Sequence, residues 1–441
     1  MIPRIPSVLR GLRPFTMAVV VAVVVGIAVG AATQALRGLI GLLTAALTAR
    51  LRPEHGNLAL ALLPLAGILL AGALQKYVLH RRLDHGTERI ADRLRTGRLA
   101  YPASSMFTPM AASTLTLGFG GSAGAEGPSA AIGAAVGSWL GGKAGADSRL
   151  LRIMVGCGAG AGIAGIFCSP VGGMLFTLEV LQVELSLVAM IALAAACMAS
   201  ALTAYTLRGF TYCVSFLPPV GMSPKVVVWG LVLGVVCGLY AVYYRRVMAG
   251  ARRGLERMPW VWRRWAVGGA ALGLLVFCLP VLYGEGYGAL SRIINGHSYV
   301  LTLESPFRAL AAHRWLVPAV VGALVLAKPL AAAATTCGGG VAGDFAPTLV
   351  AGALLGLLVS MGAGGLCGLS VPAGVVAFVA MAGVMAGVVR APLMAVFISA
   401  EMAGGYAFLL PLTLCALVSY GISRALDRST SPLSPITEKL E

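Results

Sequence analysis

The chain consists mostly of long apolar runs separated by short polar segments. The runs lie near residues 16–48, 58–79, 149–178, 185–207, 225–247, 266–283, 315–335, 348–366, 371–389 and 391–423. A helix needs about 20 apolar residues to cross a bilayer, and most of these runs approach or exceed that length. The pattern predicts an all-α polytopic membrane protein with polar surface loops at 208–224 and 284–314.

Proline and glycine interrupt many of these apolar stretches, for instance at Pro128, Pro170, Pro347 and Pro392. Irregular backbone is tolerated at membrane depth only where the protein itself buries the freed polar groups. Several runs are also too long or too short for one clean span. The sequence therefore predicts many unequal, tilted and broken helices.

The composition agrees with a membrane protein. Of 441 residues, 58% are hydrophobic and only 11% are charged, and the mean hydropathy is +0.88. Soluble domains carry about 25% charged residues. The nine cysteines form no CxxC pair and no metal-ligand spacing, so we interpret them as small apolar packing residues and expect neither a metal site nor a cofactor.

The net charge of +17 comes from short segments between the apolar runs. The basic segments are 1–15, 80–99, 245–265 and the tail from Arg424. This is the distribution that the positive-inside rule describes, so these segments and both termini are expected in the cytoplasm of a cell with the chain in its inner membrane. The location of the charge argues for the lipid bilayer, and not nucleic acid, as the partner.

An internal repeat divides the chain into two halves. The segments "GSAGAEGPSAAIG" (121–133) and "GVAGDFAPTLVAG" (340–352) share glycines and a proline at the same positions, 219 residues apart. The segments "AGIAGIFCSPVGGMLFTLE" (161–179) and "GVMAGVVRAPLMAVFISAE" (383–401) match in the same order at an offset of 222 residues.

We therefore expect a basic arm over 1–15, a first repeat half over 16–215, a second over 216–423, and a short tail over 424–441. Transporter halves are often inverted relative to each other, with the substrate site where broken helices of the two halves meet. The repeat by itself leaves the relative orientation of the two halves open.

The first repeated motif predicts an anion site. In each half, glycines precede a proline that is followed by sequence compatible with a helix, and proline is favoured in the first turn. A helix start offers free N–H groups and the positive end of the dipole. Two such starts that meet between the halves would bind an anion. The alternative is a pair of glycine hinges without a ligand.

Glu126 lies where that positive end is expected. A carboxylate at membrane depth costs several kcal/mol when it is unpaired, so its presence needs a reason. Ionised, it can occupy the place of the anion, and protonated, it can leave, which makes it a candidate gate. The alternative is a fixed partner of the helix start that never moves.

These motifs resemble the CLC family of chloride channels and proton-coupled chloride antiporters. "GAEGP" (124–128) is similar to the family's G-(R/K)-E-G-P, whose Glu is the external gate, and "GDFAP" (343–347) is similar to its G-x-F-x-P. The resemblance extends in order over roughly 80–440. It implies an inverted-repeat helical fold, a homodimer, and one anion pathway per subunit.

The resemblance also implies which residues form the site. Glu126 is the expected gate. The expected anion-binding positions, through their backbone, are Gly124, Ala125, Gly127, Pro128, Gly343, Asp344, Phe345 and Ala346.

The sequence departs from the family pattern at the other anion ligands. The family's G-S-G-x-P is absent, and its place falls near "DHGTE" (84–88), so His85 and Thr87 are candidate ligands in place of the Ser. For His85, an ordinary cytoplasmic histidine in a basic loop is the favoured interpretation. The tyrosine near the C-terminus is also missing, and Ser434 stands near its place. The inner Glu of the coupled antiporters corresponds to Val180.

Three further acids need an interpretation. Asp344 would repel an anion if it faced the path, so we expect it to point away and to cap the helix or to pair with a base. Glu179 and Glu401 occupy matched positions in the two halves. We expect a shared role at helix ends, with a place for Glu179 in a proton pathway as the alternative.

The resulting functional prediction is transport of chloride or similar small inorganic anions, channel-like or weakly coupled to protons. A proton-coupled chloride or fluoride antiporter of the same family is the alternative, and a secondary transporter of an organic anion is the alternative from another class. An enzyme is not expected, because all five histidines lie outside the apolar runs.

Overall fold

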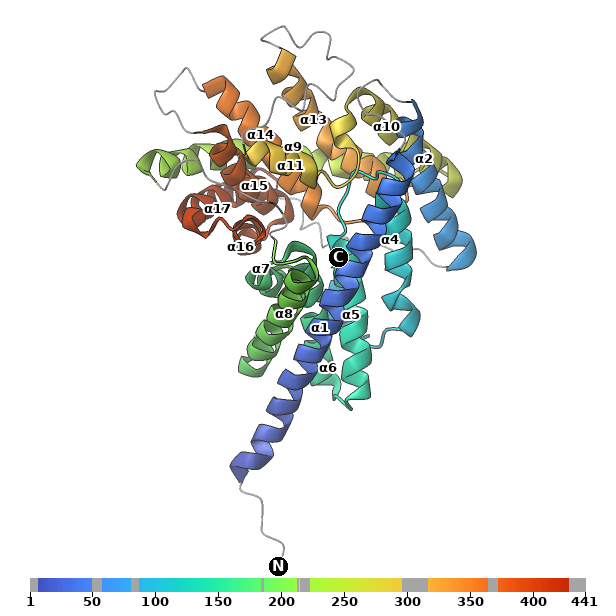
Figure 1. The fold of residues 1–441 in the computed structure, drawn as a ribbon, viewed down its shortest axis with the longest axis vertical. Helices are drawn as coiled ribbons and strands as arrows, with labels where there is room; N and C mark the ends of the chain where they lie inside the picture. Colours follow the sequence, from blue (N-terminus) through green and yellow to red (C-terminus); the bar gives the residue numbers. More distant parts are fainter. Residues whose placement is uncertain are drawn as a thin grey trace, which may run out of the picture.

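The computed structural model describes residues 7–49, 58–80, 87–183, 186–211, 214, 223–295, 316–363 and 372–427. Within these ranges the secondary structure is helical and no strand is formed (Figure 1). Nine of the described helices are long and apolar enough to cross a membrane. The prediction of an all-α polytopic membrane protein is confirmed.

The α-helices of the first half are α1 (Ser7–Thr48), α2 (Leu58–Ala73), α3 (Thr87–Thr96), α4 (Thr108–Gly118), α5 (Glu126–Lys143), α6 (Ser148–Phe167), α7 (Pro170–Leu175) and α8 (Leu187–Leu207). Those of the second half are α9 (Pro224–Glu256), α10 (Val261–Cys278), α11 (Tyr287–Ile294), α13 (Leu316–Thr336), α14 (Phe345–Ala363), α15 (Ala373–Val389), α16 (Pro392–Ala403) and α17 (Leu409–Leu426). Short π-helical turns follow α2 and α7.

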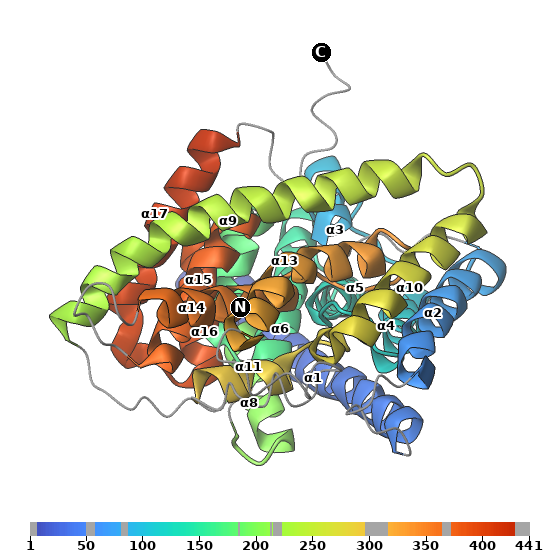
Figure 2. The same cartoon turned by 90° about the horizontal axis from the view of Figure 1, so that it is seen from above.

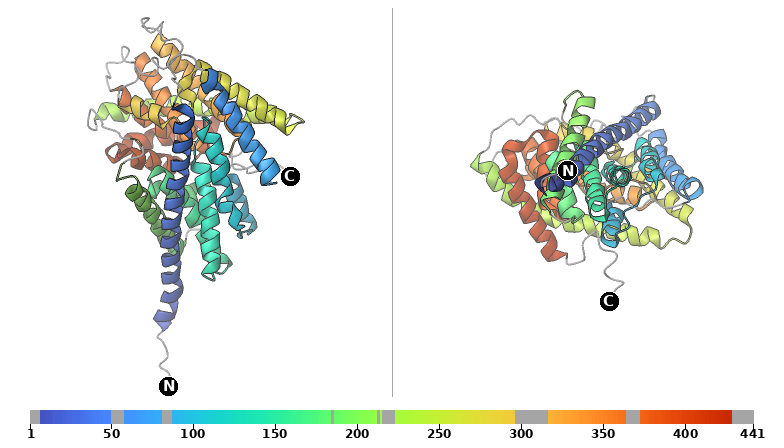
Figure 3. Two further views of the ribbon diagram at one scale, coloured as in Figure 1. Left: turned by 45° about the vertical axis from the view of Figure 1, so that its right-hand side comes forward. Right: turned by 90° about the horizontal axis from the view of Figure 1, so that it is seen from below.

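The helices of each half pack mainly against one another. α1 lies along α5, α6 and α8, and its N-terminal end extends beyond them (Figure 3). In the second half, α9 contacts α13, α15 and α17 and runs across the full width of the molecule (Figure 2). The extension of α9 to Glu256 carries the basic segment 245–256, which the apolar pattern had placed beyond the helix end.

Small residues allow the closest helix contacts, as is common in membrane proteins. α5 and α6 cross at Gly133 and Gly158, where a Cβ on either residue would collide with the carbonyl oxygen of the other. The backbones of α5 and α6 are therefore in direct contact, and this contact fixes the position of α5 in the interior.

The repeat predicted from the sequence is visible in the backbone. α6 and α15 both end at a non-glycine residue in the left-handed region, Cys168 (φ 54°) and Arg390 (φ 62°). A proline helix, α7 or α16, follows each of them two residues later. α5 and α14 start beside each other and run in opposite directions, α5 toward the bottom and α14 toward the top of Figure 1, as inverted halves require.

The structure corrects three expectations about element boundaries. The apolar runs 149–178 and 391–423 each contain two helices, because a turn before Pro170 in the first and after Ala403 in the second divides them. The polar stretch 284–314 contains α11. α4 and α5 fall outside all the apolar runs, since the protein buries them and they do not need a lipid-facing surface of 20 apolar residues.

Candidate functional site

The two halves meet at their repeated glycine motifs. Gly124 donates its N–H to the carbonyl of Gly343 at 2.9 Å, and Gly343 donates to the carbonyl of Gly124 at 2.7 Å. Helix α5 starts two residues after the first glycine and α14 two residues after the second. The free N–H groups of two helix starts are therefore brought to one point in the interior.

Glu126 fills that point. Its Oε1 accepts the N–H of Phe345 at 2.5 Å and the N–H of Ala346 at 3.3 Å, and the carboxylate also accepts the N–H of Glu126 itself. The residue is only 1% exposed. A carboxylate from the first half thus caps the first helix of the second half and bridges both helix starts.

The Glu126 carboxylate is held by backbone and not by side-chain donors. Its Oε2 is buried and has no hydrogen-bond partner among the described residues. Gly124 and Gly343 leave the space for it, since a Cβ on Gly124 would overlap Oε2 and one on Gly343 would press against the same carboxylate. Glycine at both positions is needed for this close approach.

The arrangement can bind a small anion in place of the carboxylate. Backbone N–H groups and two helix-dipole ends attract negative charge without supplying a counter-charge of their own. When the Glu126 carboxylate leaves, the N–H groups of Phe345 and Ala346 lose their acceptor. A small anion can then accept these hydrogen bonds in its place. Binding by such groups favours a small inorganic anion over any cation.

The expected backbone positions gather around this point. Gly124, Ala125 and Gly127 lie on the α5 side, and Phe345 and Ala346 on the α14 side. Pro128 and Pro347 are each the third residue of their helix, within the first turn, where proline lacks only an N–H that has no partner there.

Asp344 lies one residue before α14. Its Oδ1 is buried without a hydrogen-bond partner in the described ranges, and the carboxylate interacts electrostatically with Arg252 of α9 and Glu88 of α3. No ion pair or side-chain cap of Asp344 is described, so its expected direction away from the anion stays a prediction.

The structure leaves the remaining candidate ligands untested. His85 and Ser434 lie outside the described residues. Thr87 is the first residue of α3, a helix that packs against α5 and α6. Its role as an anion ligand stays a prediction.

Glu179 and Glu401 each cap a proline helix of the opposite half. Glu179 accepts the N–H of Leu393 at 3.2 Å and that of Met394 at 2.8 Å, at the start of α16. Glu401 accepts the N–H of Val171 at 3.2 Å and that of Gly172 at 3.0 Å, at the start of α7. The exchange is reciprocal and matches the expected role at helix ends, whereas a proton pathway through Glu179 stays untested.

Four buried or half-buried residues around Glu126 were not identified from the sequence, and these are Ser122, Tyr244, Glu285 and Lys328. Lys328 is 1% exposed and donates through Nζ to Ser122 Oγ at 2.9 Å, and Glu285 accepts the N–H of Ala125 at 3.1 Å. Tyr244 of α9 is fully buried, and its hydroxyl has no hydrogen-bond partner in the described chain.

Some of these residues left a signal in the sequence. Lys328 is the only charged residue within the apolar run 315–335, and an ionisable residue at membrane depth is a functional candidate by default. Glu285 stands in "YGEGYG" (283–288), which has no counterpart in the first half and therefore escaped a search based on the repeat.

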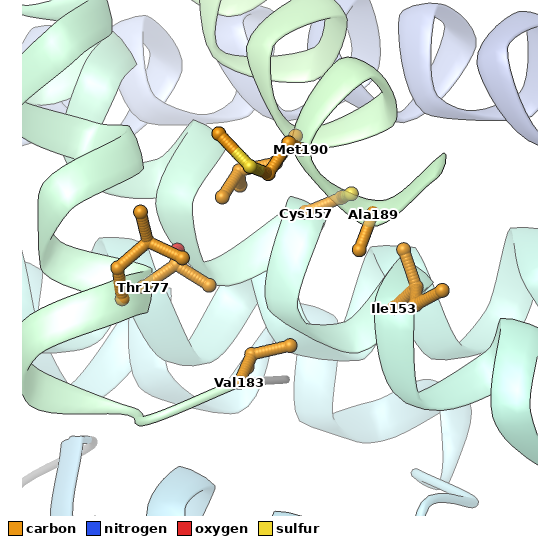
Figure 4. Close-up of a pocket in the computed structure, with 8 residues that line it drawn as sticks. Ile153, Cys157, Thr177, Val183, Ala189 and Met190 are labelled. Atoms are coloured by element: carbon orange, nitrogen blue, oxygen red, sulfur yellow. The ribbon is translucent and has the colours of Figure 1, made fainter. Parts of the chain in front are cut away.

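A small pocket lies apart from the gate, between α6, α8 and the π-helical turn after α7 (Figure 4). Its lining is apolar except for Thr177 and Cys157. The hydroxyl of Thr177 lies 3.3 Å from two backbone carbonyls, of Gly156 and Gly173, and donates there. The lining contains neither a charged side chain nor a residue of the two glycine motifs.

Comparison with solved structures supports the fold. A slow cyanobacterial Cl⁻/H⁺ antiporter superposes with a TM-score of 0.79 at 23% identity, covering 96% of this chain and 97% of that one. A CLC-type fluoride/proton antiporter gives a TM-score of 0.72 at 23% identity over 93% and 96% of the two chains. At this identity the similarity establishes the architecture alone.

Comparison with known sequences adds the family. A ClcB-like chloride channel protein of Ralstonia nicotianae is 30% identical over 390 residues, 86% of this chain and 85% of that protein. The voltage-gated ClC-type chloride channel ClcB of Citrobacter koseri is 27% identical over 378 residues, 82% and 84% of the two chains. The model of the voltage gated chloride channel family matches residues 66–424. With this match and the inverted halves, the chain belongs to the voltage-gated chloride channel family, the CLC family.

Proposed function

We propose that this protein moves chloride or similar small inorganic anions across the inner membrane through a pathway gated by Glu126. The observation that carries the proposal is the position of the Glu126 carboxylate on the N–H groups of Phe345 and Ala346. Those donors are the ones an anion would use, so ion and carboxylate compete for one place. The curated relatives are named as chloride channels, which supports chloride as the ion.

We propose further that permeation is channel-like or only weakly coupled to protons. Val180 stands where the resemblance places the inner Glu of the coupled antiporters, and Glu179 beside it is occupied by two backbone N–H groups of α16. A residue that cannot ionise cannot carry a proton from the inner side to the gate.

A proton-coupled antiporter is the second candidate function. The two solved structures described above are a Cl⁻/H⁺ antiporter and a fluoride/proton antiporter, and their folds cover almost all of this chain. Other acids near the gate, Asp344 among them, are available to carry protons. An organic-anion transporter is the third candidate, and a gate built from backbone N–H groups without a large side-chain pocket disfavours it.

The positive-inside pattern supports cytoplasmic termini, and the family supports a homodimer embedded in the bilayer. In this arrangement each subunit carries its own Glu126 and its own pathway.

An anion-flux assay on vesicles containing the purified protein tests the proposal. Vesicles loaded with chloride should release it when a potassium ionophore removes the charge imbalance, and vesicles without protein should not. Repeating the assay with fluoride and with a small organic carboxylate separates the candidate substrates. Absence of flux for chloride, combined with flux for the carboxylate, would overturn the proposal.

A further inference from the structure

Lys328 of α13 places a positive charge in the interior beside the gate. Its side chain is 1% exposed, and its described hydrogen bond is the one from Nζ to Ser122 Oγ at 2.9 Å. Ser122 lies three residues before Ala125, which Glu285 contacts, and four before Glu126, so the ammonium lies near both carboxylates. A buried charge is costly unless opposite charges are nearby, so the two carboxylates explain how the protein tolerates it.

Glu285 lies in the segment between α10 and α11 and is half-buried. Its Oε1 accepts the N–H of Ala125 at 3.1 Å. Ala125 is the residue directly before α5, and its N–H is among the donors that the anion site was expected to use. A second carboxylate therefore occupies the α5 side of the site.

The two helix starts of the site are thus covered by two different acids. Glu126 takes the N–H groups of Phe345 and Ala346 on α14, and Glu285 takes that of Ala125, directly before α5. Lys328 is hydrogen-bonded to Ser122, three residues before Ala125, so its positive charge lies close to the segment that both acids contact. The repeat does not predict the contact of Glu285 with Ala125, because the first half has no acidic residue at the position that matches Glu285.

The path of α10 indicates the side of the membrane. α10 begins at Val261, within the basic segment 245–265 that we place in the cytoplasm, and Glu285 follows seven residues after its end at Cys278. One span separates Glu285 from the basic segment, so it lies toward the outer side of the gate.

We propose that Glu285 is a second gating carboxylate, on the outer side of Glu126, and that Lys328, fixed by Ser122, is the cation that serves this site. The proposal rests on the anion pathway proposed above. An anion that enters must take the Ala125 N–H from Glu285 before both helix starts coordinate it. Lys328 stays in place and supplies the positive charge that compensates for the anion.

The test uses the Glu126→Gln variant as background, because there the first carboxylate no longer competes. Chloride affinity is measured by calorimetry on purified protein, with Glu126→Gln compared with Glu126→Gln/Glu285→Gln. A neutral amide accepts a hydrogen bond about half as strongly as a carboxylate. The dissociation constant for chloride should therefore fall by roughly three- to tenfold in the double variant.

Removal of the cation gives the opposite expectation. Glu126→Gln/Lys328→Met should weaken chloride binding by about tenfold or more, since the compensating charge is lost. The triple variant with Glu285→Gln and Lys328→Met restores charge balance without the cation. If Lys328 attracts the anion, the triple variant still binds more weakly than the Glu126→Gln/Glu285→Gln variant. Equal affinity of these two variants would overturn the role of Lys328 as the charge that compensates for the anion.

A matched control removes an acid elsewhere. Asp92→Asn, on the short helix α3, should leave chloride affinity unchanged in the same background. Where Glu285→Gln does not give monodisperse protein, Glu285→Asp keeps the charge near Lys328 and shortens the reach toward Ala125, and the same gain in affinity is expected.

The outcomes separate this proposal from the proposed function. Equal chloride affinity of the Glu126→Gln protein with and without Glu285, within twofold, would overturn the second gate while the anion pathway stands. No chloride flux and no chloride binding by the Glu126→Gln protein itself would overturn the pathway.

Discussion

Gly124 and Gly343 exchange two backbone hydrogen bonds, at 2.9 Å and 2.7 Å, although 219 residues separate them. This antiparallel bridge joins the two halves of the molecule at their repeated motifs. It also explains why both motifs begin with glycine, since any side chain here would enter the space of the Glu126 carboxylate. The repeated glycines therefore join the two halves and also leave the space for the carboxylate of the proposed gate.

Gly343→Val should abolish anion flux. A Cβ at this position would press against the gate carboxylate and lie 2.8 Å from the N–H nitrogen of Gly127, so a branched side chain fills the space that the anion needs. Chloride efflux from vesicles measures the loss. Gly421→Val on α17 is the control, because no atom lies within 4 Å of its added Cβ. Efflux at the parent rate from the Gly343→Val protein would show that the anion passes elsewhere.

Glu126→Gln should raise anion flux and remove its response to external pH. The neutral amide is a weaker acceptor than the carboxylate for the N–H groups of Phe345 and Ala346, and it cannot titrate. Flux is measured over a series of external pH values, with Glu256→Gln at the end of α9 as a distant control. A Gln variant that responds to pH as the parent does would contradict the gate assignment.

The extent to which the sequence predicts this site follows from the repeat. Glu126 and Phe345 belong to matched motifs, and a shared spacing of glycine and proline is enough to bring both into one hypothesis. The helix start itself is a local property, since proline and glycine act on the backbone of their own segment. For Glu126 and Phe345, the helix start expected from the local sequence and the pairing expected from the repeat point to the same site.

Other residues of the site could not be found in this way. Glu285 reaches Ala125 across 160 residues, and Lys328 reaches Ser122 across 206. Such contacts depend on how α10, α11 and α13 pack against the first half, which no local motif encodes. α5 was likewise absent from the apolar runs, because a helix buried in protein does not need the hydropathy of one that faces lipid.

Glu401→Ala should destabilise the protein more than Glu179→Ala. Glu401 is 5% exposed and accepts from Ser169 Oγ at 2.5 Å and Tyr406 Oη at 2.7 Å as well as from the start of α7. Removal of a buried charged acceptor leaves several donors unpaired, with a cost of about 3 kcal/mol. Glu179 is only partly buried and has two backbone donors, so its loss should cost less.

Thermal unfolding in detergent compares the two variants. The midpoint should fall by several degrees for Glu401→Ala, and Glu401→Gln should recover part of the loss because the amide oxygen still accepts. Equal midpoints for the parent and Glu401→Ala would mean that the helix-end contacts contribute nothing measurable.

Anion movement should not drive protons with a fixed stoichiometry. Val180 cannot accept a proton, so the inner relay that a strict exchanger needs is absent at that position. The reversal potential of vesicles or planar bilayers should follow the chloride gradient alone. A reversal potential that shifts with the proton gradient would contradict this, and Glu179→Gln and Asp344→Asn would then locate the proton carrier.

Chloride should bind weakly in the open site, with a dissociation constant in the millimolar range or above. Neither a serine nor a C-terminal tyrosine hydroxyl is evident at the family positions, and each neutral hydrogen bond contributes about 0.5–1.5 kcal/mol, so two missing donors weaken binding by about tenfold or more. Modest selectivity among halides should accompany this, since backbone N–H groups discriminate little by size. Calorimetry on the Glu126→Gln protein measures both properties.

A dissociation constant for chloride below about 100 micromolar would mean that a further hydrogen-bond donor contacts the anion. Tyr244 is then the first residue to change, because its hydroxyl is fully buried and has no hydrogen-bond partner in the described chain. Tyr244→Phe should weaken tight binding by several-fold, while Thr87, His85 and Ser434 are the next to test. Unchanged affinity in Tyr244→Phe would return the search to those three residues.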